Sequence, residues 1–396
     1  MKEKKIVITY GTYDLLHEGH IRLLKRAKAL GDYLIVGVTD ENYDRSRGKL
    51  NVFQSTQDRV KAIEALDFVD KVIIETHKNQ KVEDIQKYKA DIFAIGSDWE
   101  GYFDYLNEYT KVIYLPRTQG ISSTQLRAAK FKKIKLAILS ESNSYKLFMQ
   151  EAKFVPNIET TLINSINDLN SNYNAIYINS NNAYTLAKKA LELNKHILCE
   201  NLLELEPSEL KELTLLAKHK KLLLLAGLKN AYYPAFNEMV KRVKSIDIKE
   251  LRATTNIMEY SSQALLLYKV LGKNLTLDIF NHKDNLSKIV ISRHKGDTLA
   301  ISQLNSLKSK NDAMLSGTKG YIYIPSPWWE TKKFYLNKKA YSYEFDGNGL
   351  RYMIAEFASL IQREKSDSNI LSLQDIIGIN KLTYKLKSLE EVKEIK

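Results

Sequence analysis

The chain has 396 residues, of which 44% are hydrophobic and 27% are charged. This length accommodates two or three domains, and the composition excludes both a small disulfide scaffold and wholesale disorder. The single cysteine, Cys199, cannot form an intramolecular disulfide. With no leading apolar segment and no run of eighteen apolar residues, we expect a cytoplasmic protein without signal peptide or membrane span.

The formal net charge of +13 is compatible with a nucleic acid, a membrane surface or an anionic small molecule as partner. Lysines are scattered among glutamates, as in Lys211-Glu212, and no run of five basic residues occurs. We therefore expect no nucleic-acid partner and no membrane partner. Local phosphate chemistry on a solvated basic surface is the better interpretation.

The first part of the chain alternates short apolar runs with amphipathic stretches. Five runs rich in Val and Ile are predicted to be strands: residues 5–11, 33–39, 71–75, 92–96 and 111–115. Residues 19–30 and 56–66 have the apolar spacing of helices. This alternation predicts parallel βαβ units, whose ligands bind beyond the carboxyl ends of the strands.

A basic junction over residues 127–135 leads into a second series. Its predicted strands are residues 134–139, 175–179, 196–200 and 222–227, and its predicted helices are residues 183–193 and 208–219. Longer strand-like pieces follow, including residues 288–292 and 320–324, and then a helix at 349–362 and a polar tail from residue 365. The pattern predicts an α/β protein with three domains, residues 1–131, 132–245 and 246–396, the last an α+β open sheet.

The loop after the first strand reads Gly11-Thr12-Tyr13-Asp14-Leu15-Leu16-His17-Glu18-Gly19-His20. Glycines let phosphate oxygens approach the backbone, and the following helix supplies unpaired N–H groups. His17 and His20 are three residues apart at the helix start, which places both rings on one side. Such imidazoles can stabilise charge around phosphorus. A zinc site lacks further ligands, and simple helix capping is the other alternative.

A second loop follows the fifth strand and reads Arg117-Thr118-Gln119-Gly120-Ile121-Ser122-Ser123-Thr124. Ser122 and Gln125 have the spacing of a capping box, which predicts a helix start whose N–H groups face the sheet edge. Arg117 can donate two hydrogen bonds to phosphate oxygens. Taken alone, this segment also fits an ordinary capped helix.

The two loops, together with the block from Gly96 to Gly101, closely resemble glycerol-3-phosphate cytidylyltransferases, through the H-x-G-H and R-T-x-G-I-S-[ST]-T signatures. The resemblance spans residues 5–129 and implies a Rossmann-like nucleotidyltransferase sheet. It also implies transfer of CMP from CTP, with Mg²⁺ on the triphosphate, to a phosphorylated acceptor. Glycerol 3-phosphate is the family default, and a ketose phosphate is an alternative. The main rival is the related group that transfers AMP to pantetheine or nicotinamide phosphates.

The resemblance also implies roles for particular residues. Catalysis falls to His17, His20, Lys49 and Arg117. Nucleotide binding falls to Gly11, Thr12, Tyr13, Asp14, Gly19, Asp98, Thr118, Gly120, Ile121, Ser122, Ser123 and Thr124. Lys49 and Lys81 are expected to contact substrate phosphates, the alternative being exposed surface charges. No protein metal ligand is expected. The product would be a CDP-linked precursor of a surface glycan such as capsule or teichoic acid.

Residues 134–386 resemble the glucose-fructose oxidoreductase and inositol dehydrogenase family, with Rossmann-like and α+β parts. Ser140, Ser142 and Tyr145 replace the family's G-x-G-x-x-G glycines, and Asn201 replaces its catalytic lysine. NAD(P) is therefore not expected. The alternatives are a bifunctional enzyme that also reduces a keto group, and a scaffold that sets a homo-oligomer, expected to be a dimer. The aromatic segments 232–234 and 325–329 could stack on a sugar, although core packing is the preferred interpretation.

Overall fold

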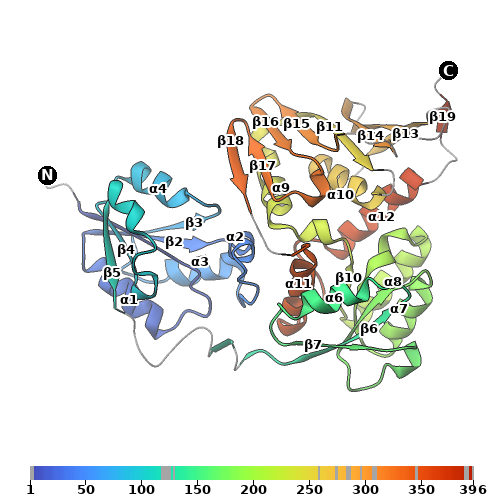
Figure 1. Cartoon of the computed structure of the whole chain (residues 1–396), viewed down its shortest axis with the longest axis horizontal. Coiled ribbons are helices and arrows are strands. Elements are labelled where there is room, and N and C mark those ends of the chain that lie inside the picture. Colours follow the sequence, from blue (N-terminus) through green and yellow to red (C-terminus); the bar gives the residue numbers. More distant parts are fainter. Residues whose placement is uncertain are drawn as a thin grey trace. The chain divides into compact units, whose positions relative to one another are not determined.

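The computed structural model describes residues 4–116, 126–127, 130–256, 259–272, 275–281, 287–294, 297–305, 310–343, 347–387 and 392–394. The chain divides into two compact units, Met1–Phe131 and Lys132–Lys396 (Figure 1). The first unit contains one five-stranded sheet, and the second contains a five-stranded and a nine-stranded sheet.

The sheet of the first unit is entirely parallel. Its strands are β1 (Ile6–Gly11), β2 (Tyr33–Thr39), β3 (Lys71–Glu75), β4 (Ile92–Gly96) and β5 (Lys111–Leu115), in the order β3-β2-β1-β4-β5. These are the five strands that the Val- and Ile-rich runs predict. The order reverses between β1 and β4, and such a switch point opens a crevice at the carboxyl ends of the strands.

Helices cover both faces of this sheet. They are α1 (Glu18–Lys28), α2 (Glu41–Ser46), α3 (Thr56–Glu64) and α4 (Gln80–Tyr88), with the short turns η1 (Ser97–Trp99) and η2 (Asp104–Glu108) after β4. Leu24 of α1 and Ile63 of α3 pack in one apolar cluster. Ile85 of α4 packs with Phe93 in another. The carboxyl edge of the sheet is therefore bordered by α1 and α3 on one side and by α4 and η2 on the other.

The second unit begins with another parallel sheet. Its strands are β6 (Ile134–Ser140), β7 (Ile158–Leu162), β8 (Ala175–Asn179), β9 (His196–Cys199) and β10 (Leu224–Ala226), in the order β10-β9-β8-β6-β7. Its helices are α6 (Tyr145–Ala152), α7 (Ala183–Glu192) and α8 (Pro207–Lys220), with the turns η3 (Ile166–Asp168), η4 (Glu200–Glu204) and η5 (Lys229–Tyr232). The sequence pattern misses β7 and α6.

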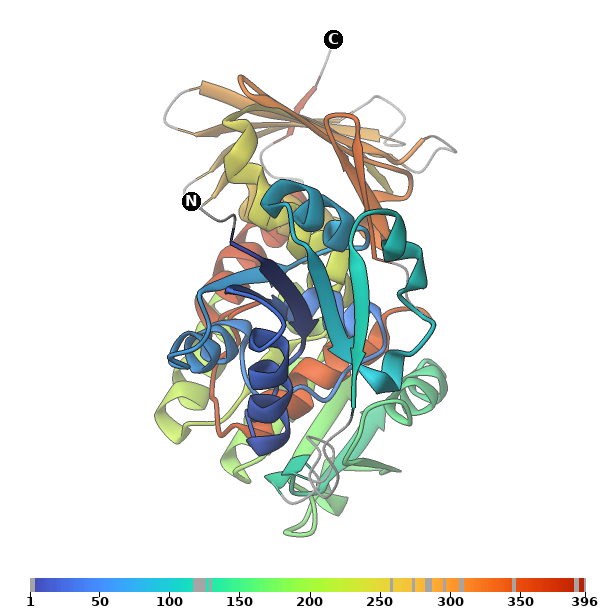
Figure 2. The same cartoon turned by 90° about the vertical axis from the view of Figure 1, so that its left-hand side faces the viewer.

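A large, mostly antiparallel sheet follows. Its strands are β11 (Ile248–Asn256), β12 (Thr276–Asn281), β13 (Ser287–His294), β14 (Asp297–Asn305), β15 (Ala313–Gly317), β16 (Gly320–Ile324), β17 (Lys333–Leu336), β18 (Lys339–Ser342) and β19 (Val392–Glu394). Helices α9 (Pro234–Ile246) and α10 (Tyr260–Leu271) pack against it (Figure 2). The predicted α/β fold class with an open α+β sheet is confirmed.

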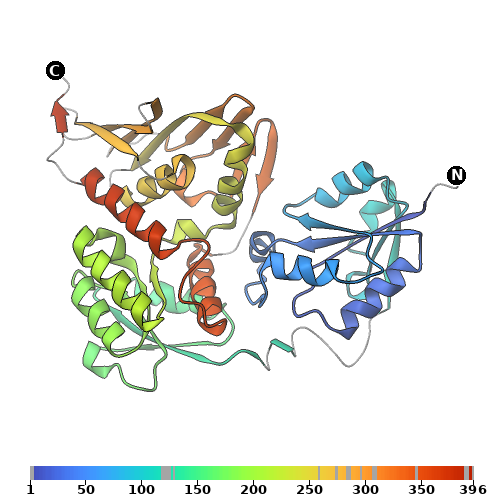
Figure 3. The same cartoon turned by 180° about the vertical axis from the view of Figure 1, so that it is seen from behind.

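The end of the described chain differs from the prediction. After the expected helix α11 (Leu350–Gln362), residue 365 does not begin a polar tail, because α12 (Leu373–Lys387) follows and packs on α10 and α8 (Figure 3). Its buried side chains include Ile376, Ile379 and Leu386. Tyr232 and Trp328, the latter at η6 (Trp328–Glu330), are fully buried, which confirms core packing for these aromatics. The boundary predicted between residues 245 and 246 stays a prediction.

Candidate active site

The loop between β1 and α1 has an uncommon backbone. Tyr13 and Leu15 both have φ of 51°, a left-handed conformation that costs a non-glycine residue about 1 kcal/mol. The Tyr13 ring folds back over Gly11, where a Cβ atom would lie 2.8 Å from the ring. Glycine is therefore required at the end of β1. The strained loop brings Gly11, Thr12 and Asp14 to the switch point of the sheet.

The two histidines lie against each other at the start of α1. The His17 and His20 rings stack with centroids 3.9 Å apart, and the edge of Tyr13 packs on His20. His17 is the N-cap residue, and its Nδ1 accepts the backbone N–H of Gly19 at 3.1 Å. An accepting Nδ1 leaves the proton of a neutral imidazole on Nε2. His17 therefore offers an Nε2–H donor rather than a metal-binding lone pair at that nitrogen.

The environment keeps both imidazoles neutral. Burial lowers the pKa of His17. For His20, burial together with the neighbouring His17, Lys49 and Arg127 lowers the pKa to about 3. The pair therefore donates hydrogen bonds without carrying charge at neutral pH.

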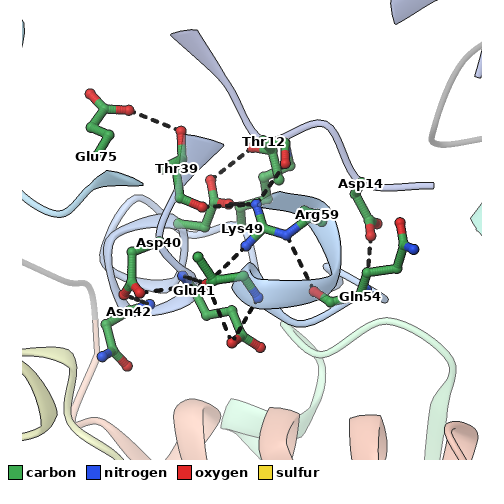
Figure 4. Close-up of polar contacts among 12 residues, drawn as sticks. Thr12, Asp14, Thr39, Asp40, Glu41, Asn42, Lys49, Gln54, Arg59 and Glu75 are labelled. Atoms are coloured by element: carbon green, nitrogen blue, oxygen red, sulfur yellow. Dashed lines mark hydrogen bonds and ion pairs between the residues drawn. The ribbon is translucent and has the colours of Figure 1, made fainter. Parts of the chain in front are cut away.

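Lys49 reaches the same edge of the sheet from the turn after α2 (Figure 4). Its Nζ donates to Thr12 Oγ1 at 2.7 Å, and Thr12 Oγ1 in turn donates to Asp44 Oδ1 at 3.0 Å. Arg47 Nη2 donates to the same carboxylate oxygen at 2.9 Å. Asp44 is fully buried, and its carboxylate orients Arg47 directly and Lys49 through Thr12 at the carboxyl edge of the sheet.

Arg59 is a site residue that sequence reasoning misses. It is fully buried, and its Nη1 donates to the backbone oxygens of Thr12 and Thr39 at 2.6 and 2.8 Å (Figure 4). It thereby joins the ends of β1 and β2. The available signal was its position on the apolar face of α3, one residue before Val60.

Arg127 is a second residue that the sequence patterns do not single out as part of the site. Its Nη1 lies 3.2 Å from Asp14 Oδ2, and the Asp14 carboxylate also accepts the backbone N–H groups of Phe53 and Gln54 at 2.9 Å. Asp14 is buried, so it anchors a guanidinium and the loop before α3. Its predicted nucleotide contact stays a prediction.

Lys81 lies on the other side of the edge, on α4. It is 7% exposed and its Nζ donates to the Glu75 carboxylate, so the alternative of an exposed surface charge is wrong. Asp98 is exposed on η1, directly after β4. The described residues contain no group of three or more His, Cys, Asp or Glu able to hold a metal.

Part of the predicted site lies outside the described residues. These positions are Arg117, Thr118, Gly120, Ile121, Ser122, Ser123 and Thr124, together with the predicted helix cap at Gln125. The second loop and its role in triphosphate binding therefore stay predictions. Arg127, just beyond this segment, contacts Asp14 of the first loop.

A parallel sheet whose switch point carries neutral imidazole donors, an ammonium and guanidinium groups defines a nucleotidyltransferase domain. A cytidylyltransferase-like family model matches residues 8–166. A glycerol-3-phosphate cytidylyltransferase from Bacillus spizizenii is 52% identical over 123 residues, which cover 31% of this chain and 95% of that protein. One from Staphylococcus aureus is 47% identical, covering 31% and 92%. The chain belongs to the cytidylyltransferase-like family through its first unit.

Solved structures resemble a larger share of the chain in fold alone. A 3-ketoreductase from Actinomadura kijaniata, in complex with NADP, matches with a TM-score of 0.56 and 12% identity, covering 67% of this chain and 99% of that one. A UDP-N-acetylglucosamine 3-dehydrogenase from Acidithiobacillus ferrooxidans matches with a TM-score of 0.55 and 11% identity, covering 66% and 98%. The expected likeness of the second unit to this group of oxidoreductases is confirmed at the level of fold.

The dinucleotide that this fold implies does not fit the residues present. The loop after β6 closes on itself, since Ser140 Oγ donates to the Ser142 oxygen at 2.9 Å. The Glu141 carboxylate accepts Ser180 Oγ–H at 2.6 Å and Asn181 N–H at 3.0 Å. A cavity of about 380 Å³ beside it is lined by Glu141 and Tyr145, and no lysine or arginine of the described ranges is among its lining residues. The Glu141 carboxylate repels a pyrophosphate in this place. Tyr145 stands where the resemblance places a glycine that lets the helix and strand pack closely.

No helix in the described ranges is long and apolar enough to cross a membrane.

Proposed function

We propose that the first unit transfers CMP from CTP to the phosphate of a polyol or sugar phosphate. A phosphate oxygen of the acceptor attacks the α-phosphorus of CTP, the bond between that phosphorus and the bridging oxygen to the β-phosphate breaks, and pyrophosphate leaves. A CDP-linked product results. The observation that carries this proposal is the stacked, neutral His17–His20 pair beside the Lys49–Thr12 contact.

The geometry fits a reaction that requires no general base. The attacking oxygen belongs to an ionised phosphate, so no proton has to be removed from it. The imidazoles have low pKa values, which suits them to donate hydrogen bonds to α-phosphoryl oxygens as charge shifts toward the leaving group. Lys49 and Arg127 supply positive charge at the same edge. We expect Mg²⁺ to enter with the triphosphate, because this ion is commonly bound through substrate phosphates.

We propose further that the second unit does not transfer hydride. Its β6 loop and Glu141 oppose a dinucleotide, and Asn201 cannot act as the ammonium donor that the family resemblance places there. A scaffold that forms a homodimer is the remaining role. By resemblance, the CDP-linked product supplies a surface glycan such as teichoic acid or capsule from within the cytoplasm.

The test is a pyrophosphate-release assay with Mg²⁺ on the full chain. CTP and ATP are compared as donors, with glycerol, pentulose and hexulose phosphates as acceptors. We expect turnover with CTP and its loss in His17→Ala and His20→Ala. Turnover with ATP but not with CTP would show that the chain transfers AMP instead of CMP. No turnover with any donor and acceptor would refute the proposal.

A further inference from the structure

Two further cationic side chains, Lys81 of α4 and Arg47, lie near the carboxyl edge of the first sheet, each paired with a carboxylate. Lys81 Nζ lies 4.6 Å from the ring centroid of Tyr10 and 5.5 Å from that of Phe103. The Arg47 guanidinium lies 4.7 Å from the Tyr43 ring. Lys81 and Arg47 are close enough to influence each other electrostatically. A reaction between two phosphorylated substrates needs cationic groups for a second phosphate, and Arg47 and Lys81 are the candidates outside the histidine and Lys49 group.

Three exposed and two buried aromatic side chains lie beside these cations. We call Tyr43, Trp99, Tyr102, Phe103 and Tyr105 the aromatic wall. Trp99, Tyr102 and Tyr105 are 45%, 66% and 49% exposed, and a cluster of exposed aromatics on one short segment marks a binding surface.

The rings of the wall form a continuous series. Ring centroids are 6.4 Å apart from Tyr105 to Phe103 and 5.8 Å from Phe103 to Trp99. The Tyr102 ring packs edge-on against Phe103 at 4.9 Å. Each step along the series exceeds the length of a three-carbon chain. The wall is therefore longer than a three-carbon skeleton.

The wall lies next to the buried Lys81–Glu75 pair, since Lys81 Nζ is 5.5 Å from the Phe103 ring centroid. Burial raises the pKa of Tyr43 to about 12, and Glu75, Tyr102 and Tyr105 contribute to the increase, so their charged or hydroxyl groups lie near the Tyr43 hydroxyl. Burial also raises the pKa of Tyr105, with Tyr102 and Glu75 contributing. Glu75 accepts the Thr39 hydroxyl at 2.9 Å as well as the Lys81 ammonium. Tyrosine hydroxyl groups thus accompany the aromatic faces, a combination that suits a polyhydroxylated carbon skeleton.

We propose that the acceptor is a sugar phosphate, or a polyol phosphate longer than glycerol, with its carbon skeleton against the aromatic wall and its phosphate near Arg47 and Lys81. The inference rests on the proposed CMP transfer and adds the class of acceptor. The C–H face of the skeleton packs on Tyr105 and Tyr102, and its hydroxyls bond to the tyrosine hydroxyls.

The experiment uses the full chain at saturating CTP and compares glycerol 3-phosphate with ribitol 5-phosphate and sorbitol 6-phosphate. Tyr102→Ala and Tyr105→Ala remove exposed rings, and the unfolding midpoint of each variant is measured because the Tyr102 ring packs on buried Phe103. Tyr109→Ala is the matched control, because Tyr109 is 43% exposed on the same segment. We expect at least one longer phosphate to exceed glycerol 3-phosphate in kcat/KM. Each wall variant should lower that value by about 3- to 10-fold, mainly through the acceptor KM.

The result for glycerol 3-phosphate separates the outcomes. Under the proposal, its kcat/KM changes less than about twofold in the wall variants, and Tyr109→Ala changes neither acceptor. Preference for glycerol 3-phosphate, equal effects on all acceptors, or a changed solution mass with unchanged acceptor preference would overturn the inference while leaving CMP transfer intact. If the chain shows no turnover at all, the proposed function fails. Calorimetric binding of sorbitol 6-phosphate, compared between the unaltered chain and Tyr105→Ala, then decides the role of the wall.

Discussion

Asp44 provides the sharpest prediction about the nucleotide edge. Replacing it by asparagine keeps an oxygen that can accept the Thr12 hydroxyl but removes the charge that Arg47 faces at 2.9 Å and Arg59 at 3.8 Å. A hydrogen bond to a charged group contributes about 1.5–3 kcal/mol. Asp44 positions Lys49 through Thr12, so losing one such interaction raises the activation free energy by this amount. The expected decrease in kcat/KM is about 10- to 150-fold. We expect Asp44→Asn to show this decrease.

The pH dependence gives the prediction a specific signature. Burial lowers the pKa of Lys49, and Asp44 counteracts that decrease. Without the Asp44 charge the pKa of Lys49 falls further, so Lys49 loses its proton at lower pH and the alkaline limb of the kcat/KM profile moves to lower pH. The other charged groups that face Lys49 are Arg127, Arg47 and Asp14, and they are unchanged in the variant.

The assay is steady-state pyrophosphate release from pH 6 to 10, with the KM for CTP and the unfolding midpoint measured on each variant. Asp32→Asn is the control, because Asp32 is exposed just before β2, at the opposite end of the strand from the site. An Asp44→Asn enzyme within twofold of the unaltered one at every pH would refute the argument. So would a decrease in activity that only tracks a lower unfolding midpoint.

Four further predictions follow from the same contacts. Arg59→Met leaves the backbone oxygens of Thr12, Thr39 and Gln54 without their buried guanidinium donor and also removes the cation near Asp44, so urea unfolding should show a loss of about 3–5 kcal/mol; a loss below 1 kcal/mol would contradict the assignment. His20 binds a proton near pH 6.5 when unfolded but only near 3 when folded, so the free energy of unfolding falls as pH falls from about 6.5, by about 1 kcal/mol per unit; the slope should be smaller in His20→Asn. Fluorescence titration should detect no NADPH binding to the full chain, and saturable binding would reinstate the bifunctional alternative. A chain truncated after residue 131 should keep CMP transfer and lose the dimer, whereas an unchanged subunit number would contradict a scaffold role for the second unit.

The sequence predicts the first sheet well because its strands are rich in buried Val and Ile and are separated by clear turns. Four of the five predicted ranges coincide with β2 to β5, and the fifth differs from β1 by one residue. The loop with His17 and His20 follows from the same argument, since a glycine ends β1 and a helix begins immediately after it.

The remaining features depend on tertiary contacts. Helix α2 has only six residues, too few to show a helical period, so Asp44 could not be placed beneath Thr12 and Lys49. Arg59 is a charged residue, which a sequence pattern places on the surface. It is buried because carbonyl oxygens at the ends of two strands accept its hydrogen bonds. The aromatic wall combines η1 and η2 with Tyr43, which lies far from them in sequence. Helix α12 was missed although its buried residues recur at helical spacing, because polar Asn380 and Thr383 interrupt the apolar face.

The most direct test of the account is a ³¹P NMR spectrum of the full chain incubated with CTP, Mg²⁺ and a polyol or sugar phosphate. The account predicts that the CTP signals give way to those of pyrophosphate and a CDP-linked diphosphate diester, and that His17→Ala and His20→Ala abolish this change. CTP signals that persist with every acceptor, or product formation that survives loss of both imidazoles, would contradict the claim that this pair acts at the α-phosphorus.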